Sequence, residues 1–378
     1  MVVLVQTLDW LADAAQHRAA LGLHRTLRSR SSDVIDLASN DYLGLGSHPE
    51  ILDAACAAMW EWGAGATGSR LVTGTTELHL ALEAELAAFV GAESGLVFSS
   101  GYTANLGVVA ALSGRGSLVL SDSASHASLV DACRLSRADV TVFDRRDLAS
   151  LSHLLSSRAQ ERAVVVTDSV FSADGDLAPL RELHMLCRRF TALLVVDEAH
   201  GIGVRGEGGR GLVHEVGLAG EPDVVVTATL SKSLGAQGGV VLGPSVVRDH
   251  LIDTARPFIF DTGLAPASVG AARAALAVVQ REPERVTALR DNAARLASLV
   301  GVETPESAVV SVVLGDPERA NDAAQKAFRR GVHVGCFRPP SVPEGTSRLR
   351  LTARATLTDA EFTTIADVLQ SILQSVLA

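Results

Sequence analysis

Seven short runs of apolar, largely β-branched residues recur through the middle of the chain, and stretches with the pattern of helices separate them. Runs that are apolar on both faces and alternate with helices are typical of a mostly parallel sheet that is covered by helices on both sides. The sequence therefore predicts an α/β fold. The predicted strands are residues 94–100, 116–122, 139–144, 162–170, 192–199, 223–230 and 238–244.

After about Gly243 the sequence pattern changes to long, alanine-rich helices. A chain of 378 residues suits one large domain with a smaller companion. We predict an N-terminal helix and arm (1–45), a large α/β domain (46–245) and a C-terminal α+β domain (246–378). The elements expected in the last part are a long alanine-rich helix at 266–280, strands at 307–315, 332–336 and 347–352, and a final helix from Asp359.

Residues 76–91 show how the covering helices can be recognised. Thr76 is a suitable N-cap and Gly91 a suitable C-terminal stop. The apolar residues that fall on one face of this helix are Leu78, Leu82, Leu86 and Phe89.

Two patterns found in nucleotide-binding proteins occur around the end of the predicted strand 192–199. One is made by the glycines that follow it, and the other by residues 197–200. A dinucleotide-binding G-x-G-x-x-G turn joins its strand directly to the first glycine and then opens a helix. Here four residues separate Val196 from Gly201, and the sequence EGGRGL follows in place of a helix. Residues 197–200 also match the acidic box of certain helicases, but the sequence has no G-x-x-x-x-G-K-[ST] phosphate loop. Both nucleotide-binding classes are therefore disfavoured.

Composition narrows the classes of partner further. A net charge of -10 without a basic stripe argues against nucleic acid. The four cysteines are scattered and show no C-x-x-C spacing, which favours reduced thiols over disulfides or a zinc site. The first residues lack the basic-then-apolar order of a signal peptide, and residues 95–114 are too polar to cross a bilayer. We expect a cytoplasmic protein with no nucleic-acid, membrane or metal partner.

Lysine is rare in this chain. Of 33 basic residues, only Lys232 and Lys326 are lysines. Lys326 lies in an ordinary amphipathic helix pattern, whereas Lys232 follows directly after an apolar run in which a solvated surface role is difficult to accommodate. A lysine at a strand end can extend its amine to the surface, but the position of Lys232 favours a chemical role.

Ligands of parallel α/β sheets bind at the carboxyl ends of the strands, so the residues that follow the strands are considered together. These segments bring hydroxyls, a carboxylate, an imidazole and a lysine to one edge of the predicted sheet. They are residues 99–105, 167–176, 197–201 and 227–235.

This set of groups matches what pyridoxal phosphate requires. The cofactor needs a lysine for its aldehyde, an acid facing the pyridine nitrogen, a donor for the 3-hydroxyl and a helix N-terminus for the phosphate. Lys232, Asp197, His200 and Gly101 with Tyr102 are the candidates in that order. Asp197 matters most electronically, because a facing carboxylate keeps the ring nitrogen protonated. His200 on its own is more simply interpreted as a loop residue. Only its position three residues after Asp197 makes it a candidate site residue.

With these residues in place, the sequence resembles the α-oxoamine synthase family of fold-type I pyridoxal phosphate enzymes. The resemblance covers more than 300 residues, and its motifs occur in the expected order. They are LASNDYLGLG, GATGSRLVTGT, FSSGYTANL, SHASLVDA, DSVFSADGDLAPL, DEAHGIGVRG, TLSKSLG and SRLRLT.

The resemblance implies roles for further residues around the cofactor. His126 in SHAS would stack on the pyridine ring, and Ser172 in VFS would stand near the ring together with His200. Thr229, three residues before the lysine, would bind the phosphate with Gly101 and Tyr102.

The resemblance also implies the residues that bind the substrate. Arg350 would grip the carboxylate of an amino acid through its planar fork, and Asn40 and Arg25 would help to orient the substrates. Thr262 would reach the phosphate held by a partner subunit. The family often has a small hydroxyl residue where this chain has Asp261, which puts that contact in question.

As an activity, the resemblance implies decarboxylative condensation of L-alanine with a pimeloyl thioester, on coenzyme A or on a carrier protein, in biotin biosynthesis. A homodimer with the site at the subunit interface is expected from the same resemblance. Two alternatives stay open. One is another α-oxoamine synthase that takes glycine or serine and a different acyl thioester, and the other is a fold-type I aminotransferase, which needs no thioester pocket.

Overall fold

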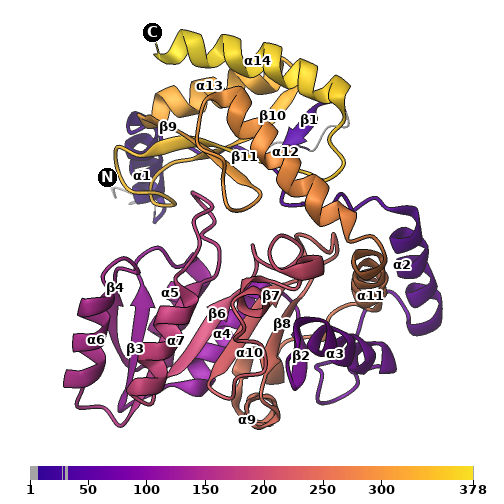
Figure 1. Cartoon of the computed structure of the whole chain (residues 1–378), viewed down its shortest axis with the longest axis vertical. Helices are drawn as coiled ribbons and strands as arrows, with labels where there is room; N and C mark the ends of the chain where they lie inside the picture. Colours follow the sequence, from indigo (N-terminus) through magenta and orange to yellow (C-terminus); the bar gives the residue numbers. More distant parts are fainter. Residues whose placement is uncertain (1–6, 28, 30–32, 378) are drawn as a thin grey trace, which may run out of the picture.

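The computed structural model describes residues 7–27, 29 and 33–377, which form two lobes, each built on one sheet (Figure 1). The larger sheet has the strand order β2-β8-β7-β6-β5-β3-β4. All its neighbours pair in parallel except β8, which is antiparallel to both β7 and β2. The predicted α/β fold is confirmed, with all seven expected strands present. They are β2 (Ser94–Phe98), β3 (Ser117–Asp122), β4 (Asp139–Phe143), β5 (Arg162–Asp168), β6 (Leu193–Asp197), β7 (Val224–Thr229) and β8 (Gly239–Gly243).

Helices cover both faces of this sheet, because successive strand residues point to opposite faces and both sets are apolar. On β5, Val164 and Val166 pack in one core and Val165 packs in the other. The first core includes α4 (Gly101–Leu112), α5 (Ala127–Ser136), α9 (Ser245–Thr254) and α10 (Arg256–Ile259). The second core includes α3 (Glu77–Val90), α6 (Leu148–Ser157), α7 (Leu180–Arg189) and α8 (Leu212–Glu215).

Helix α3 begins and ends where the sequence predicts. Thr76 and His79 form a reciprocal cap at its start, and Gly91 takes a left-handed conformation with φ 82° at its end. The predicted apolar face is buried at Leu82, Leu86 and Phe89. By contrast, the glycines after β6 open no long helix: only the short η1 (Glu207–Gly209) and α8 follow, which agrees with rejecting a dinucleotide-binding turn.

The smaller sheet has the order β1-β10-β11-β9. Its strand β1 (Ile35–Leu37) pairs in parallel with β10, so the start of the chain is built into a sheet made by its end. The predicted strands and final helix of this lobe are present as β9 (Val309–Gly315), β10 (Val332–Phe337), β11 (Ser347–Thr352) and α14 (Asp359–Leu377). The lobe also contains α13 (Pro317–Arg329), which holds the amphipathic pattern around Lys326, and α12 (Glu284–Val300), which was not predicted individually. Helix α1 (Asp9–Ala20) lies nearby (Figure 1).

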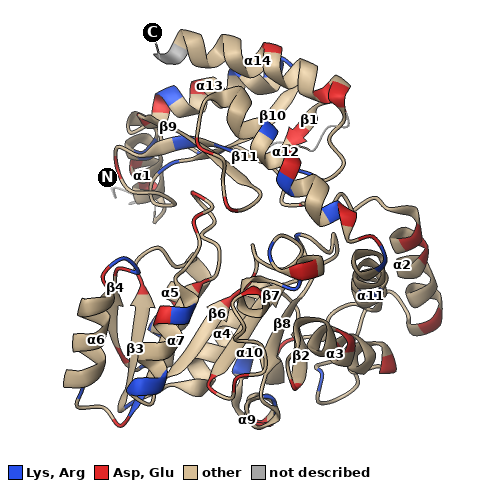
Figure 2. Ribbon diagram, viewed as in Figure 1, with Lys and Arg blue, Asp and Glu red and all other residues tan. Residues whose placement is uncertain are grey.

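The division into residues 1–45, 46–245 and 246–378 stays a prediction. Several contacts cross it: β1 pairs with β10, α11 (Pro266–Arg281) packs against α2 (Pro49–Trp62) and α3, and α9 and α10 pack against α4. From α11 the chain continues through α12 into the smaller lobe (Figure 1). Basic and acidic positions are interspersed along α12 (Figure 2). Among the described residues, no helix combines the length and apolar character needed to cross a membrane.

Candidate active site

Polar residues gather at the carboxyl edge of the larger sheet. Asp122, Asp168, Asp197 and Thr229 are the last residues of β3, β5, β6 and β7. These strands run in parallel, so their ends meet at one edge, where α/β proteins bind ligands. The predicted clustering of the segments that follow the strands is therefore what the structure has.

Asp197, at this edge, is held by two hydrogen bonds and is only 5% exposed. Its Oδ1 accepts the backbone N–H of Ala199 at 2.9 Å, and its Oδ2 accepts Asn105 Nδ2 at 2.7 Å. Asn105 is held in turn, because Thr227 Oγ1 donates to its Oδ1 at 2.6 Å. Hydrogen bonds to a charged acceptor are stronger than neutral ones, so the carboxylate is fixed in direction.

Glu198, although adjacent in sequence, faces elsewhere. Its Oε2 accepts the hydroxyl of Ser169 at 2.7 Å, and its Oε1 accepts the N–H of Val213 at 2.6 Å. Burial raises the pKa of Glu198 to about 7. The acidic pair of the sequence is thus divided: Asp197 serves the site, and Glu198 ties the glycine-rich segment to the sheet.

Lys232 and His200 form a contact beside Asp197. Lys232 Nζ lies 2.9 Å from His200 Nε2. Burial lowers the pKa of Lys232 to about 8, although Asp197 and Asp168 act in the opposite direction. Burial, together with the charges of Lys232 and Arg350, lowers the pKa of His200 well below 6.5. The pair is therefore a neutral imidazole beside an amine that loses its proton near neutral pH.

This environment predicts that Lys232 becomes reactive at an unusually low pH for a lysine. Only the unprotonated amine is a nucleophile, so we expect reductive methylation of Lys232 in the cofactor-free protein to reach half its maximal rate near pH 8. Peptide mass spectrometry follows the reaction, with Lys326, exposed on α13, as the reference site. A Lys232 rate that still rises steeply above pH 10 would contradict the lowered pKa.

His126 lies at the start of α5 and belongs to the same site, because Asp197 and Lys232 both act on it electrostatically. Its Nδ1 is 2.7 Å from Ser128 Oγ, and its backbone N–H donates to Asp168 Oδ2 at 2.8 Å. The side chain of His126 is accessible. Partial removal from solvent lowers its pKa, the charge of Lys232 lowers it further, and the charge of Asp197 opposes both. A neutral, accessible and fixed imidazole ring suits stacking on a flat ligand.

The N-terminus of α4, with Thr229 beside it, has the groups that can bind an anion, and we refer to it as the anion cradle. Ser100 caps it by accepting Thr103 N–H at 3.1 Å, while the first N–H groups of a helix have no partner within the helix. Gly101 approaches Thr229 so closely that an added Cβ would lie 3.0 Å from Thr229 Cβ. The hydroxyls of Thr229 and Ser231 lie 2.7 Å apart beside it. The side chain of Tyr102 bonds Asp131 instead, so Tyr102 can serve this cradle only through its backbone.

Arg350 brings the smaller lobe to the same place. It lies on β11, is 3% exposed and donates from Nη1 to Asn40 Oδ1 at 3.0 Å. Its Nε donates to the backbone oxygen of Ser172 at 2.6 Å. Three predicted site residues from distant parts of the sequence are thereby joined. Ser172 meets Arg350 through its carbonyl, not through its hydroxyl.

Two predicted residues are not brought into this group. Arg25 is exposed on the segment between α1 and β1, which Arg338 holds through the carbonyls of Gly22 and His24. Thr262 is exposed and forms a bridge with Ser69. Within one chain, neither residue contacts Lys232, His200 or Asp197.

Asp261 lies at the anion cradle of its own chain. Its Oδ2 accepts a hydrogen bond from Ser99 Oγ, and its Oδ1 accepts the N–H of Thr262 at 2.9 Å. Ser99 Oγ is also 3.1 Å from Thr103 Oγ1, in the first turn of α4. A carboxylate thus stands where the resemblance leads one to expect a small hydroxyl, and Thr262 follows directly after it.

Three residues of the site were missed by sequence reasoning: Asn105, Tyr42 and Asp168. Asn105 lies one helical turn after Gly101, a spacing that places it on the same side of α4 and could have identified it. Tyr42 Oη lies 2.5 Å from His200 Nδ1. Asp168 is the register partner of Asp197 on the neighbouring strand.

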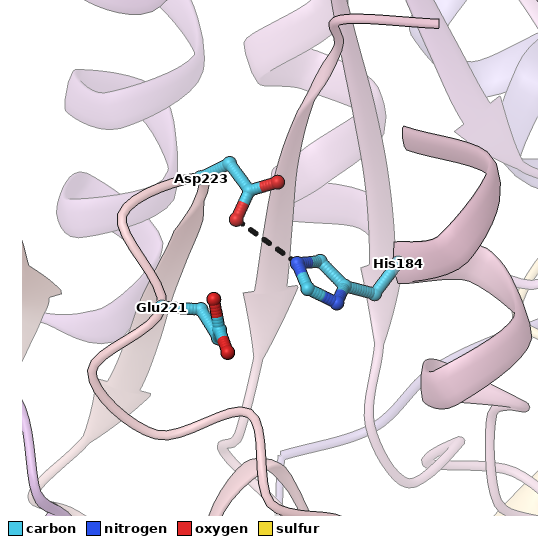
Figure 3. A group of neighbouring side chains, drawn as sticks. All are labelled: His184, Glu221 and Asp223. Carbon is cyan, nitrogen blue, oxygen red and sulfur yellow. Dashed lines mark hydrogen bonds and ion pairs between the residues drawn. The ribbon is translucent and has the colours of Figure 1, made fainter. Parts of the chain in front are cut away.

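One group of possible metal ligands lies at the opposite edge of the sheet. His184, Glu221 and Asp223 have ligand atoms within 4.8 Å of one another, and His184 Nε2 lies 2.9 Å from Asp223 Oδ1 (Figure 3). Arg188 also pairs with both carboxylates, at 3.2 Å to Glu221 and 3.4 Å to Asp223. The guanidinium already supplies positive charge there, so an ion-pair network accounts for this group.

The comparisons with known proteins agree with this geometry. The family described as aminotransferase class I and II matches residues 32–369. Proteins named 8-amino-7-oxononanoate synthase from Mycolicibacterium smegmatis and Mycolicibacterium gilvum are 66% and 65% identical over 369 residues, which cover 97% of this chain and 97% of each relative.

Solved structures give the same result. Serine palmitoyltransferase of Sphingomonas wittichii matches with a TM-score of 0.91 and 31% identity over 99% of this chain and 98% of its own. A high-resolution structure of SPT with PLP also gives 0.91 and 31%, over 99% of both chains. The 8-amino-7-oxononanoate synthase of Francisella tularensis gives 0.77 and 26%, over 92% and 99%. The chain therefore belongs to the aminotransferase class I and II family, and within it to the 8-amino-7-oxononanoate synthases.

Proposed function

We propose that this protein catalyses the pyridoxal 5'-phosphate-dependent condensation of L-alanine with a pimeloyl thioester. The products are 8-amino-7-oxononanoate, carbon dioxide and the free thiol, and the reaction belongs to biotin biosynthesis. The observation that carries this proposal is a partly buried lysine beside a fixed aspartate and a neutral histidine, in a chain 64–66% identical to relatives of that name.

The residues of the candidate active site fit pyridoxal phosphate. Lys232 Nζ would hold its aldehyde, and Asp197 would face its pyridine nitrogen. His126 would stack on the ring, with His200 near its 3-hydroxyl. The start of α4 at Gly101 and Tyr102, together with Thr229, would bind its phosphate. Ser231, whose hydroxyl meets that of Thr229, is a further phosphate donor by position.

When bound, pyridoxal phosphate supplies an electron sink that stabilises negative charge on the α-carbon of an amino acid. Arg350 would hold the carboxylate of L-alanine by its fork, with Asn40 and Ser172 fixing the guanidinium. Lys232 Nζ is placed to take the α-proton and later to return a proton to carbon. A pKa of about 8 suits both roles, because amine and ammonium are both populated near neutral pH.

The proposal is tested by incubating the protein with pyridoxal phosphate, L-alanine and pimeloyl thioesters of coenzyme A and of a carrier protein. We expect equal amounts of carbon dioxide and free thiol, formed only when alanine and a thioester are both present. Glycine and serine replace alanine in parallel reactions, to test the other α-oxoamine synthase activities. Consumption of a keto acid acceptor without release of carbon dioxide would instead identify an aminotransferase.

We also propose that the protein is a homodimer whose interface includes α2 and the loop before α3. This surface exposes large apolar side chains: Trp60 is 91% exposed and Val72 79% exposed, with Phe260 at 68%. Large exposed apolar side chains are candidates for burial at a protein interface. Thr262 follows Phe260 by two residues and bridges Ser69, so the same surface carries the threonine expected to reach a partner's phosphate.

The dimer proposal predicts that Trp60→Asp weakens self-association. Burying a charge in place of an indole at an interface centre costs at least about 2.7 kcal/mol, which raises the dimer Kd by about 100-fold. Sedimentation velocity over a concentration series measures this. Met185→Asp, at a residue 62% exposed on α7, is the matched control and keeps the wild-type Kd. A Trp60→Asp protein that sediments as the wild type would refute this interface.

We infer a reducing compartment, the cytoplasm, from the cysteines. All four are free thiols in the structure, at Cys56, Cys133, Cys187 and Cys336, and proteins of oxidising compartments usually pair theirs.

A further inference from the structure

Tyr42 is a buried tyrosine at the centre of the site, and the function above leaves its hydroxyl without a role. The chain has two tyrosines, and Tyr42 is 0% exposed whereas Tyr102 is 43% exposed. Its backbone is fixed between β1 and α2: its oxygen accepts the N–H of Ala355 at 2.8 Å, and Asp41 Oδ1 accepts the N–H of Leu45 at 2.8 Å. The phenol therefore enters the site from a rigid turn.

The hydroxyl of Tyr42 connects the two halves of the site. It lies 2.5 Å from His200 Nδ1 and 3.3 Å from Asn40 Oδ1, and Arg350 Nη2 donates to it at 3.5 Å. The other nitrogen of His200 is 2.9 Å from Lys232 Nζ. One unbroken chain of contacts thus runs from the amine of Lys232, through an imidazole and a phenol, to the guanidinium of Arg350.

The donors and acceptors of this chain have two consistent arrangements. A neutral imidazole has one N–H and one acceptor nitrogen. When the Lys232 nitrogen donates to Nε2, Nδ1–H donates to Tyr42, and the phenol O–H is free to donate to Asn40. When the Lys232 nitrogen instead accepts from Nε2–H, Nδ1 is an acceptor and the phenol O–H must donate to it. An ammonium has no lone pair and allows only the first arrangement, whereas the neutral amine allows both, so protonation of Lys232 fixes the direction of this O–H.

Several charged or titratable groups act on the members of this chain. Lys232, Arg350 and His126 act on His200, and Arg350 acts on Tyr42. Asp197 and Asp168 act on Lys232. Of these groups, Arg350 is the one in direct contact with Tyr42, so a substrate carboxylate on Arg350 changes the charge next to the phenol.

We propose that Tyr42 is a positioning residue for the reaction above: its hydroxyl fixes the ring of His200 through Nδ1 and couples the proton on Lys232 to the carboxylate site at Arg350. The role of Tyr42 in the reaction rests on the proposed function. Its contacts with His200 and Arg350 do not depend on that function.

The first test compares Tyr42→Phe with wild type, both loaded with pyridoxal phosphate. We expect the pH midpoint of the visible absorbance to shift by about one unit, and the Kd of L-alanine, measured by absorbance without thioester, to rise about tenfold. Ser136→Ala is the control, because it removes a buried hydroxyl from α5 that bonds Cys133 O at 2.7 Å. It should lower the melting temperature by about 2 °C and leave midpoint and Kd unchanged. A Tyr42→Phe protein with the wild-type midpoint and Kd would overturn the proposal.

The second test needs neither a Tyr42 variant nor the cofactor. Incorporation of 3-fluorotyrosine labels two sites, and Tyr102→Phe assigns the ¹⁹F signals. We expect the Tyr42 signal of the cofactor-free protein to move with a midpoint near pH 8, together with Lys232, and to lose this response in Lys232→Ala. A Tyr42 signal that stays constant through this range would refute the coupling. A wild-type protein that stays colourless with pyridoxal phosphate refutes the proposed function instead, and this test still decides the role of Tyr42.

Discussion

Lys232→Ala is expected to lower turnover by at least about 10⁴-fold and to abolish the visible absorbance of the protein with pyridoxal phosphate. The change removes both the amine that holds the aldehyde and the base that takes the α-proton, and a positioned base alone contributes up to about 10⁴-fold. Melting temperature should fall little or rise, because the burial that lowers the pKa of Lys232 disfavours its charged form. Absorbance spectra and the release of thiol measure the two effects.

The remaining lysine makes this prediction sharp. Lys326→Ala, on the exposed side of α13, should leave both spectrum and turnover unchanged. Borohydride reduction followed by peptide mass spectrometry should place the cofactor on Lys232 and leave Lys326 unmodified. Turnover at the wild-type rate in Lys232→Ala, or trapping of the cofactor on Lys326, would contradict the assignment.

Asp197→Asn is expected to keep the fold and to lower kcat/KM by about 10³-fold, or about 4 kcal/mol of transition-state stabilisation. Asparagine has nearly the same shape and can still accept the N–H of Ala199. It removes the negative charge that keeps a facing pyridine nitrogen protonated, and that protonation makes the ring an electron sink. Melting curves, cofactor Kd and steady-state kinetics separate a folding defect from the loss of charge.

Asp168 supplies the matched control, because it is the register partner of Asp197 on the adjacent strand. Burial and the neighbouring charge of Asp197 raise the pKa of Asp168 well above its usual value. Asp168→Asn leaves the carboxylate of Asp197 in place, and an asparagine there can still accept the N–H of His126. We therefore expect kcat/KM to fall by no more than about tenfold. Equal losses in the two variants would show that the charge of Asp197 is not what the reaction uses.

The larger sheet could be predicted from the sequence because its strands are buried on both faces. Val164, Val165 and Val166 form a continuous apolar run, and its short length and β-branched residues between helices indicate a buried strand. Strand β1 could not be predicted in this way. It has three residues with Asp36 at its centre, and its pairing depends on β10, which lies almost 300 residues further along the chain.

The core of the site was predictable for a related reason. Asp197 ends strand β6, His200 and Lys232 lie three residues after the ends of β6 and β7, and the ends of parallel strands lie at one edge of the sheet. Asn105 carries only its helical spacing from Gly101 as a signal, and Tyr42 carries none, because its partner His200 is supplied by the tertiary structure alone. Arg25 and Thr262 have roles that come from the resemblance alone. These roles stay predictions, because neither side chain reaches the active site of its own chain.

The pairing of β1 with β10 has a consequence for how the protein is made. Domains tend to fold from the N-terminus while the ribosome is still at work, yet here the first strand to emerge has no neighbour until residues 332–337 exist. Asn40 and Tyr42 follow that strand and meet Arg350, which is synthesised later still. A nascent chain released before this point would already carry the lysine and the aspartate, but it would have nothing to grip the acid group of its amino acid.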